Sequence, residues 1–253
     1  GGFPELALAD NDLMAQQVMR EDVVDKVLKR DLPSLYNIRN ATELERIFLY
    51  LCNVSSEIVS IEAITKELNG VSRTTVENYI QFLESANLIY QSWPVDMAGK
   101  KVLKARPKIY IADAAIRNAV LMDDSIMTDP TGMGKVVETA VYKHIAAFYY
   151  QFATSVGYFR GGRKNKEIDV VVDYPNIKNI LIEVKYREGA PIADDDAIVE
   201  LCEEASAAIV VTKTATDFGV HNTPSGKNLL RIPAFAFLYL LGNAEKHGYR
   251  GIE

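Results

Sequence analysis

Two short apolar runs on either side of a turn constrain the fold of this chain more than any other feature of its sequence. Residues 167–173 are Glu-Ile-Asp-Val-Val-Val-Asp and residues 181–186 are Leu-Ile-Glu-Val-Lys-Tyr. Pro175 and Asn176, which lie between the two runs, favour a turn. The pattern therefore predicts two antiparallel strands that form a β-hairpin.

The hairpin brings acidic and basic side chains together. Because strand side chains alternate between two faces, pairing the runs places Asp169, Glu183 and Lys185 on one face. Carboxylate oxygens in such an arrangement are the ligands that magnesium prefers, and a neighbouring lysine can orient a water or stabilise phosphate charge. The alternative is an ordinary exposed strand with alternating charges, because a Glu-x-Lys triplet arises by chance about once in a chain of this size.

The composition describes a globular chain with no membrane segment. Hydrophobic residues make up 48% and charged residues 25% of its 253 residues, and no apolar run has the length that a membrane-spanning helix needs. Cys52 and Cys202 lie far apart in amphipathic runs, which predicts buried free thiols and a cytoplasmic location. The chain begins with Gly-Gly rather than Met and shows no signal peptide, so we expect a fragment of a longer protein.

Charge is unevenly distributed along the chain. The net charge of −6 argues against general affinity for nucleic acid. Two basic tracts nevertheless stand out, and their members include Lys100, Lys101 and Lys104 in the first and Arg160, Arg163 and Lys164 in the second. Residues 194–204 are correspondingly acidic. Such tracts are usually solvated surface, but the second one directly precedes the hairpin.

The first half of the sequence predicts helices. Residues 10–31 form a helix that Pro33 ends. Residues 42–93 form a three-helix unit, in which Thr42 is the N-cap of the first helix and Glu45 completes a capping box. The second helix covers residues 61–68. Ser72 caps the third helix, whose inward face is Val76, Tyr79, Ile80 and Leu83.

Helix, glycine turn and helix form a helix-turn-helix pattern, and strands at 88–93 and 108–112 are expected to form a wing. The third helix carries Arg73, but it also carries glutamates, which suit a DNA backbone poorly. A packing or protein-docking role is therefore the preferred interpretation of this helix, and direct reading of the DNA major groove is the alternative. The basic segment 100–108 is the better candidate for a phosphate contact.

After residue 125 the pattern changes to helix, three strands, helix and strand. The predicted elements are a helix over 133–152 that carries Glu138, a strand over 155–160, the hairpin, a helix over 193–205, a strand over 207–212 and a final helix from Pro233 to Leu241. Residues 130–135, Pro-Thr-Gly-Met-Gly-Lys, are not a phosphate-binding loop, because the first glycine and the hydroxyl residue of that motif are missing. We expect Gly132 and Gly134 to form the turn into the helix.

This order, with Glu138, Asp169, Glu183 and Lys185 in their respective elements, resembles the PD-(D/E)xK nuclease superfamily. Ile168 stands where the superfamily name has proline. More narrowly, the chain resembles the C-terminal part of prokaryotic AAA+-type ATPases, in which a winged helix and a nuclease-like domain follow a P-loop module. The segments that carry this likeness are Gly1–Glu5, Ser72–Tyr79, Pro107–Asp113, Glu167–Asp169 and Ile182–Lys185.

The resemblance implies a role for each site residue. Asp169 and Glu183 would ligate Mg²⁺ or Mn²⁺, with the carbonyl of Val184 as a further ligand. Lys185 would position or activate the water, and Glu138 would complete the acidic cluster from its helix. ATP would bind only in the N-terminal module, which this chain lacks.

We therefore expect a mixed α+β and α/β chain. Its parts are an N-terminal helical segment (1–40), a winged-helix domain (41–115) and a restriction-endonuclease-like domain with a mixed sheet (125–253). The leading hypothesis is magnesium-dependent hydrolysis of DNA. The alternatives are a non-catalytic module that regulates the ATPase and a transcriptional regulator. DNA, the ATPase module and a second copy of the chain are the partners considered.

Overall fold

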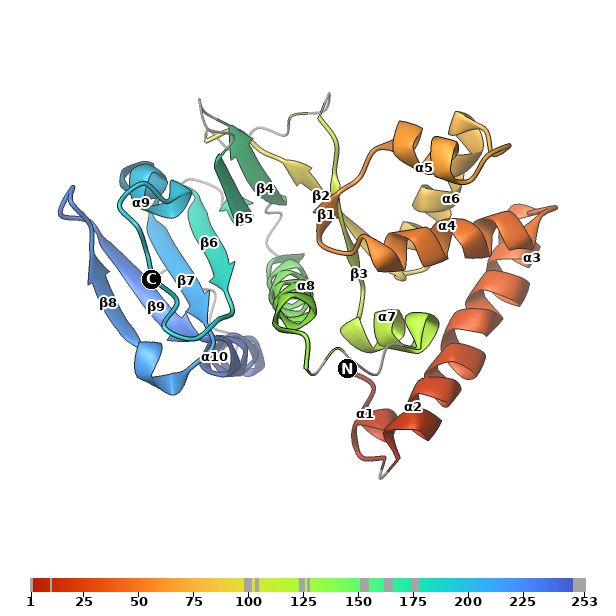
Figure 1. Ribbon diagram of the computed structural model, residues 1–253, viewed down its shortest axis with the longest axis horizontal. Helices are drawn as coiled ribbons and strands as arrows, with labels where there is room; N and C mark the ends of the chain where they lie inside the picture. Colours follow the sequence, from red (N-terminus) through yellow and green to blue (C-terminus); the bar gives the residue numbers. More distant parts are fainter. Residues whose placement is uncertain are drawn as a thin grey trace. The chain divides into compact units, whose positions relative to one another are not determined.

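The computed structural model describes residues 2–9, 11–97, 102, 105–122, 126, 128–150, 155–161, 166–173 and 178–247. The chain divides into two compact units. The first contains Gly1–Gln91 and Arg106–Asp129, and the second contains Ser92–Ala105 and Pro130–Glu253 (Figure 1). The predicted turn residues 174–177 lie outside the described residues.

The first unit is mainly helical. Its elements are α1 (Pro4–Ala7), α2 (Asp12–Val18), the π-helical segments η1 (Met19–Asp25) and η2 (Val27–Asp31), α3 (Leu32–Tyr36), α4 (Ala41–Asn53), β1 (Glu57–Ile58), α5 (Ile61–Glu67), α6 (Arg73–Ser85), the start of β2 (Ile89–Pro94), β3 (Lys108–Ile111) and α7 (Ala114–Leu121). The second half of β2, from Ser92 on, belongs to the second unit. β1 pairs antiparallel with β3. Helix α7, which Asp113 caps through the Ala115 N–H at 2.8 Å, was not expected from the sequence.

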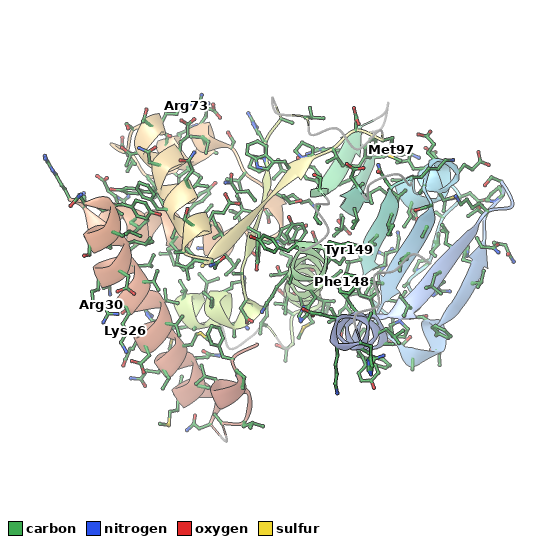
Figure 2. The ribbon with its side chains drawn as sticks, turned by 180° about the vertical axis from the view of Figure 1, so that it is seen from behind. Lys26, Arg30, Arg73, Met97, Phe148 and Tyr149 are labelled. Carbon is green, nitrogen blue, oxygen red and sulfur yellow. The ribbon has the colours of Figure 1, made fainter. Side chains whose placement is uncertain are left out.

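The prediction that Pro33 ends the first helix is wrong. Helical backbone continues through Pro33 to Tyr36, and the chain leaves it at Asn37, which adopts the left-handed conformation with φ of 51°. Two π-helical segments precede the proline, so Pro33 stands in the first turn of a new α-helical segment. A missing N–H costs little at that position. Lys26 and Arg30 lie on the exposed side of this helix (Figure 2).

The three-helix unit forms where predicted, but one of its caps differs. α4 begins at Ala41, and the side chain of Asn40 accepts a hydrogen bond from the Glu43 N–H at 3.4 Å. The prediction of Thr42 as N-cap is therefore wrong by two residues. The Ser72 cap of α6 is confirmed, because its hydroxyl accepts from the Thr75 N–H at 3.1 Å.

The predicted inward face of α6 is confirmed. Val76, Tyr79, Ile80 and Leu83 are buried in one core with residues of α4, and Leu28 and Leu32 of the first long helix join the same core. Segment 1–40 thus packs as part of the first unit. The two cysteines, Cys52 and Cys202, are free and buried as expected, and burial raises the pKa of the Cys52 thiol to about 12.

The second unit has the predicted order of helix, three strands, helix and strand. Its elements are α8 (Pro130–Tyr149), β4 (Ser155–Gly161), β5 (Lys166–Asp173), β6 (Ile180–Lys185), α9 (Ala197–Leu201), η4 (Cys202–Glu204), β7 (Ala207–Thr212), η5 (Ala215–Asp217), β8 (Gly219–Asn222), β9 (Asn228–Pro233) and α10 (Ala234–Lys246). Three expectations are corrected. Gly132 and Gly134 lie inside α8, α9 is shorter than predicted, and the β8–β9 hairpin was not expected.

The strands of the second unit follow the order β2-β4-β5-β6-β7-β9-β8. β4–β5, β5–β6 and β8–β9 are antiparallel pairs, whereas β2–β4, β6–β7 and β7–β9 are parallel. The sheet is mixed, as expected. Because β6, β7 and β9 run in the same direction, their carboxyl ends lie along one edge (Figure 1).

Helices cover both faces of this sheet. On one face, α9 packs against β5 and β6, and its Ile198 shares a core with Val171, Leu181 and Val210. α8 packs against β4 and β6, and α10 against β7, β9 and α8. The centre of β5 is buried on both faces, which explains why the alternation of its side chains is interrupted at 170–172. Among the described residues, no helix has the length and apolar character to span a membrane.

The contact between β2 and β4 depends on Gly157. A Cβ atom at this position would lie 2.2 Å from the backbone oxygen of Trp93, with which Gly157 is paired. We expect Gly157→Ala to lower the free energy of unfolding by about 1–3 kcal/mol, measured by urea denaturation. Gly134→Ala is the matched control, because nothing lies within 4 Å of that position in α8. It should raise stability by up to about 1 kcal/mol, and an equal loss in both variants would contradict the close approach.

Candidate functional site

The candidate site begins where the ladder between β5 and β6 ends. Val172 pairs with Ile180 and Val170 with Ile182, so one further step would set Asp169 opposite Glu183. Like charges directly opposite each other destabilise a sheet. Instead, the Asp169 carboxylate accepts a hydrogen bond from the backbone N–H of Val184 at 2.9 Å. The side chain thus occupies the end of the ladder.

A β-bulge lies at the same place. Gly157 of β4 pairs with Val171 of β5, whereas Phe159 pairs with Ile168. Between these two pairs, β5 has one residue more than β4. Asp169 lies in this part of β5. Bulges re-aim a side chain and occur often beside active sites. The local strand geometry therefore directs Asp169 toward β6.

Lys185 is held between two carboxylates. Its Nζ lies 3.1 Å from Oε1 of Glu183 and 2.9 Å from Oδ2 of Asp196. The lysine side chain is 11% exposed and that of Glu183 is 17% exposed. Asp196, the residue just before α9, was not predicted as a site residue. Its only sequence signal was its place in an acidic run that leads into the helix after β6.

Burial and charge determine the protonation of this network. Burial raises the pKa of Glu183, the Lys185 ammonium opposes this, and the charges of Asp169 and Asp196 add to the rise. Burial acts to lower the pKa of Lys185, but its bonds to Asp196 and Glu183 outweigh this and raise the pKa. Burial also disfavours the charged form of Asp196, yet the hydrogen bond from Lys185 holds its pKa below the usual value.

One oxygen of the network has no partner. Oε2 of Glu183 is buried and makes no hydrogen bond, while its other oxygen contacts Lys185. A buried acceptor without a partner costs about 1–3 kcal/mol, so such groups suggest a missing ion or water. The two acids fit a Mg²⁺ or Mn²⁺ ion, because Mg²⁺ often binds through one or two carboxylates together with water and substrate phosphates.

The acidic cluster expected from three elements is not assembled as one ligand set. Glu138 lies half-buried on α8, a helix that packs against β6. Within the described part of the chain, no group of three or more His, Cys, Asp or Glu residues is arranged to hold a metal ion. The structure therefore brings Asp169, Glu183 and Lys185 together, but it does not join Glu138 to them as a third ligand.

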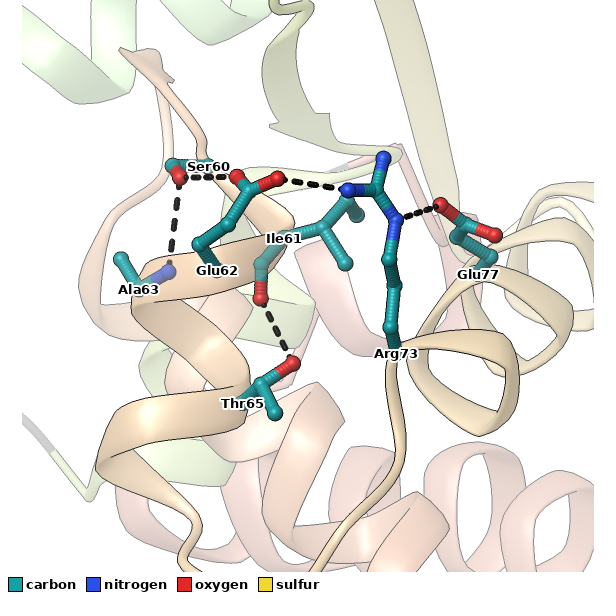
Figure 3. Close-up of polar contacts among 7 residues, drawn as sticks. All are labelled: Ser60, Ile61, Glu62, Ala63, Thr65, Arg73 and Glu77. Atoms are coloured by element: carbon teal, nitrogen blue, oxygen red, sulfur yellow. Dashed lines mark hydrogen bonds and ion pairs between the residues drawn. The ribbon is translucent and has the colours of Figure 1, made fainter.

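The basic residues expected to contact nucleic acid are only partly described. Arg73 is exposed at the start of α6, but its guanidinium donates to Glu62 and Glu77, each at 2.8 Å (Figure 3). Two carboxylates thus already neutralise much of its charge. Arg160 is exposed on β4 and pairs in register with Glu167. The other predicted contacts lie outside the part of the chain that the structure describes; they are Lys100, Lys101, Lys104, Arg163 and Lys164.

Comparison with known proteins finds two domains of unknown function. Residues 1–126 match the domain DUF8612 and residues 133–235 match the domain DUF4143. The gap between the two matches contains Asp129 and Pro130, where the chain passes from the first unit to the second. No solved structure matches this chain.

The chain is also similar to uncharacterised proteins. MJ1544 of Methanocaldococcus jannaschii is 26% identical over 190 residues, which are 74% of this chain and 40% of that protein. A Haemophilus influenzae protein is 26% identical over 121 residues, 46% of this chain and 30% of its own length. MJ1637 of the same archaeon is 24% identical over 188 residues, 73% of this chain and 38% of its own length. The chain thus spans two fifths or less of these relatives.

Proposed function

We propose that the second unit is a divalent-metal-dependent hydrolase of phosphodiester bonds in DNA. The observation that carries this proposal is the buried, unpartnered Oε2 of Glu183 beside Asp169 and Lys185. Its chemistry is that of the PD-(D/E)xK nucleases, to which the sequence pattern is similar. A winged-helix role for the first unit, an AAA+-type ATPase module elsewhere in a longer protein and a cytoplasmic location belong to the same proposal.

Each residue has a part in this chemistry. Asp169 and Glu183 would hold Mg²⁺ or Mn²⁺, with the Val184 carbonyl as a further ligand and Glu138 joining only if α8 approaches. When bound, such a cation polarises a phosphoryl oxygen and lowers the pKa of a coordinated water. Lys185 orients the attacking water, and Asp196 positions Lys185. Because Oε2 of Glu183 has no exposed surface, entry of a cation requires rotation of the Glu183 side chain.

A second candidate is a non-catalytic module that regulates an attached ATPase. The observation that favours it is the pairing of Lys185 with two carboxylates, because buried ion pairs also serve purely structural roles. The surface around α9 is acidic, with Asp194, Asp195 and Glu203 exposed. This surface suits a protein partner better than a nucleic acid.

Calorimetric titration with Mn²⁺ separates the two candidates. We expect the wild-type chain to bind Mn²⁺ and Glu183→Gln to weaken the affinity by at least about tenfold, because an amide oxygen carries no charge. Glu203→Gln is the matched control, with the same change on an exposed residue of η4, and should bind like the wild type. Absence of a binding signal, or equal affinity for all three proteins, would remove the hydrolase and leave the regulatory module.

A further inference from the structure

The carboxyl ends of three parallel strands form the edge beside this site. Lys185 of β6 pairs with Thr212 of β7, which pairs in turn with Pro233 of β9. In sheets with parallel strands, ligands bind outside the carboxyl ends. The network of Lys185 and Glu183 lies at the end of β6. The ends of β7 and β9 have no role in the proposed metal site.

Thr212 is the nearest neighbour of Lys185 on β7. Paired residues on adjacent strands lie about 4.8 Å apart and point to the same face, so the hydroxyl of Thr212 lies on the face of the Lys185 ammonium. Thr212 is completely buried, and its Oγ1 makes no hydrogen bond. Valine has the same shape and would avoid this unsatisfied group, so packing alone does not explain the hydroxyl.

Arg231 of β9 lies on the same face of the sheet. It pairs with Val210, which pairs with Glu183. Its Nη2 donates to Oδ1 of Asp217 at 3.0 Å, and Asp217 belongs to η5, which follows the carboxyl end of β7.

The ion pair with Asp217 therefore draws the guanidinium toward the carboxyl edge. Hydrogen bonds from Thr214 lower the pKa of Asp217 and keep this anchor charged. Nε of Arg231 is buried without a partner.

Three unsatisfied polar atoms thus lie on one face of three consecutive strands: Glu183 Oε2, Thr212 Oγ1 and Arg231 Nε. A hydroxyl and a guanidinium are donors that match phosphate oxygens. We infer that Thr212 and Arg231 hold a phosphate group of nucleic acid beside the Glu183–Lys185 network, after a side-chain rotation that exposes their donors. This inference rests on the proposed function and extends it to the group that holds the substrate.

DNA binding without divalent metal tests the inference. The affinity of the full chain for a fluorescein-labelled DNA duplex is measured by fluorescence anisotropy in EDTA over a series of salt concentrations. We expect Arg231→Gln to weaken binding by about tenfold or more and to reduce the slope of log affinity against log salt by about one. Thr212→Val, which lacks the hydroxyl, should weaken DNA binding. Thr212→Ser, which keeps it, should bind DNA like the wild type. Lys178→Gln, which removes an exposed charge at the amino end of β6, should bind like the wild type.

Asp217→Asn distinguishes phosphate binding from a purely structural ion pair. This variant removes the negative charge that pairs with Arg231 but keeps the arginine, so we expect its DNA affinity to equal or exceed that of the wild type. Equal losses in Asp217→Asn and Arg231→Gln, or no loss in Arg231→Gln, would overturn the inference. In a second experiment, calorimetry measures the affinity for inorganic phosphate. If Arg231→Gln weakened the binding of inorganic phosphate but not the binding of DNA, a nucleic-acid ligand would be excluded. Because no metal is present, these outcomes are independent of the Mn²⁺ titration.

Discussion

Lys185→Met is expected to lower the free energy of unfolding by about 3–5 kcal/mol at neutral pH. Methionine fills a similar volume but leaves the carboxylates of Glu183 and Asp196 without their shared partner. Glu183 then keeps a buried charge with no compensating cation. Urea denaturation monitored by circular dichroism gives the change in unfolding free energy.

The loss should depend on pH in a direction set by Glu183. Its pKa in the folded chain lies above the usual value of 4.5, so the folded state binds this proton more tightly than the unfolded state. Stability therefore falls as the pH rises through the range above 4.5. The Lys185 ammonium lowers the pKa of Glu183. Its removal should therefore raise the pKa of Glu183 further. The deficit of Lys185→Met should consequently be smaller at acidic pH than at pH 7.

Two variants provide the comparison. Lys213→Met removes a lysine whose partner, Glu188, is 79% exposed, and a loss within about 0.5 kcal/mol is expected because exposed ion pairs contribute little. The double variant Lys185→Met/Glu183→Gln should recover part of the lost stability, because it also removes the stranded charge. A deficit in Lys185→Met as small as that in Lys213→Met would show that the ion-pair network does not stabilise the fold.

Asp169→Asn is expected to reduce metal-dependent cleavage of DNA by about a hundredfold or more. The amide oxygen of asparagine can still accept the hydrogen bond from Val184, so the end of the β5–β6 ladder is preserved. What the variant loses is a negative charge for the cation. Cleavage of a labelled DNA substrate in Mg²⁺ or Mn²⁺ measures the rate, and the thermal midpoint shows that the fold is intact.

Asp173→Asn is the matched control, because it makes the same change at the other end of β5. Asp173 pairs in register with Ser155 of β4, at the end of β5 away from the network of Glu183 and Lys185. We expect cleavage close to the wild-type rate. Equal rates for the wild type, Asp169→Asn and Asp173→Asn would rule out Asp169 as a metal ligand, and loss of folding in Asp169→Asn alone would assign it a structural role.

Several local features were predictable because their causes are local. The spacing of Val76, Tyr79, Ile80 and Leu83 follows the helical period, and all four are buried. Ser72 caps α6 because its hydroxyl reaches an N–H three residues on. The wrong N-cap at Thr42 arose because two good caps, Asn40 and Thr42, stand two residues apart and a sequence pattern cannot rank them.

Other features were missed because their causes are distant or their signals are short. Helix 12–36 continues through Pro33 because π-helical segments precede it, and such segments have no sequence signature. β8 and β9 are short strands joined by residues 223–227, and the turn residues of this loop are their main signal in the sequence. Glu138 is in the predicted helix, but the packing of α8 decides which groups it can reach.

The sequence by itself determined the period of each segment and the residue types that it carries. The alternation in 167–185 was sufficient to predict adjacent strands with Asp169, Glu183 and Lys185 near one another, because strand pairing across a short turn is a local event. Only the tertiary structure decided that Lys185 meets Asp196, that Oε2 of Glu183 is left without a partner, and that Thr212 and Arg231 lie along the same edge. These contacts depend on the path of the chain through α9 and back into the sheet, and burial is a property of the packed chain rather than of any single segment.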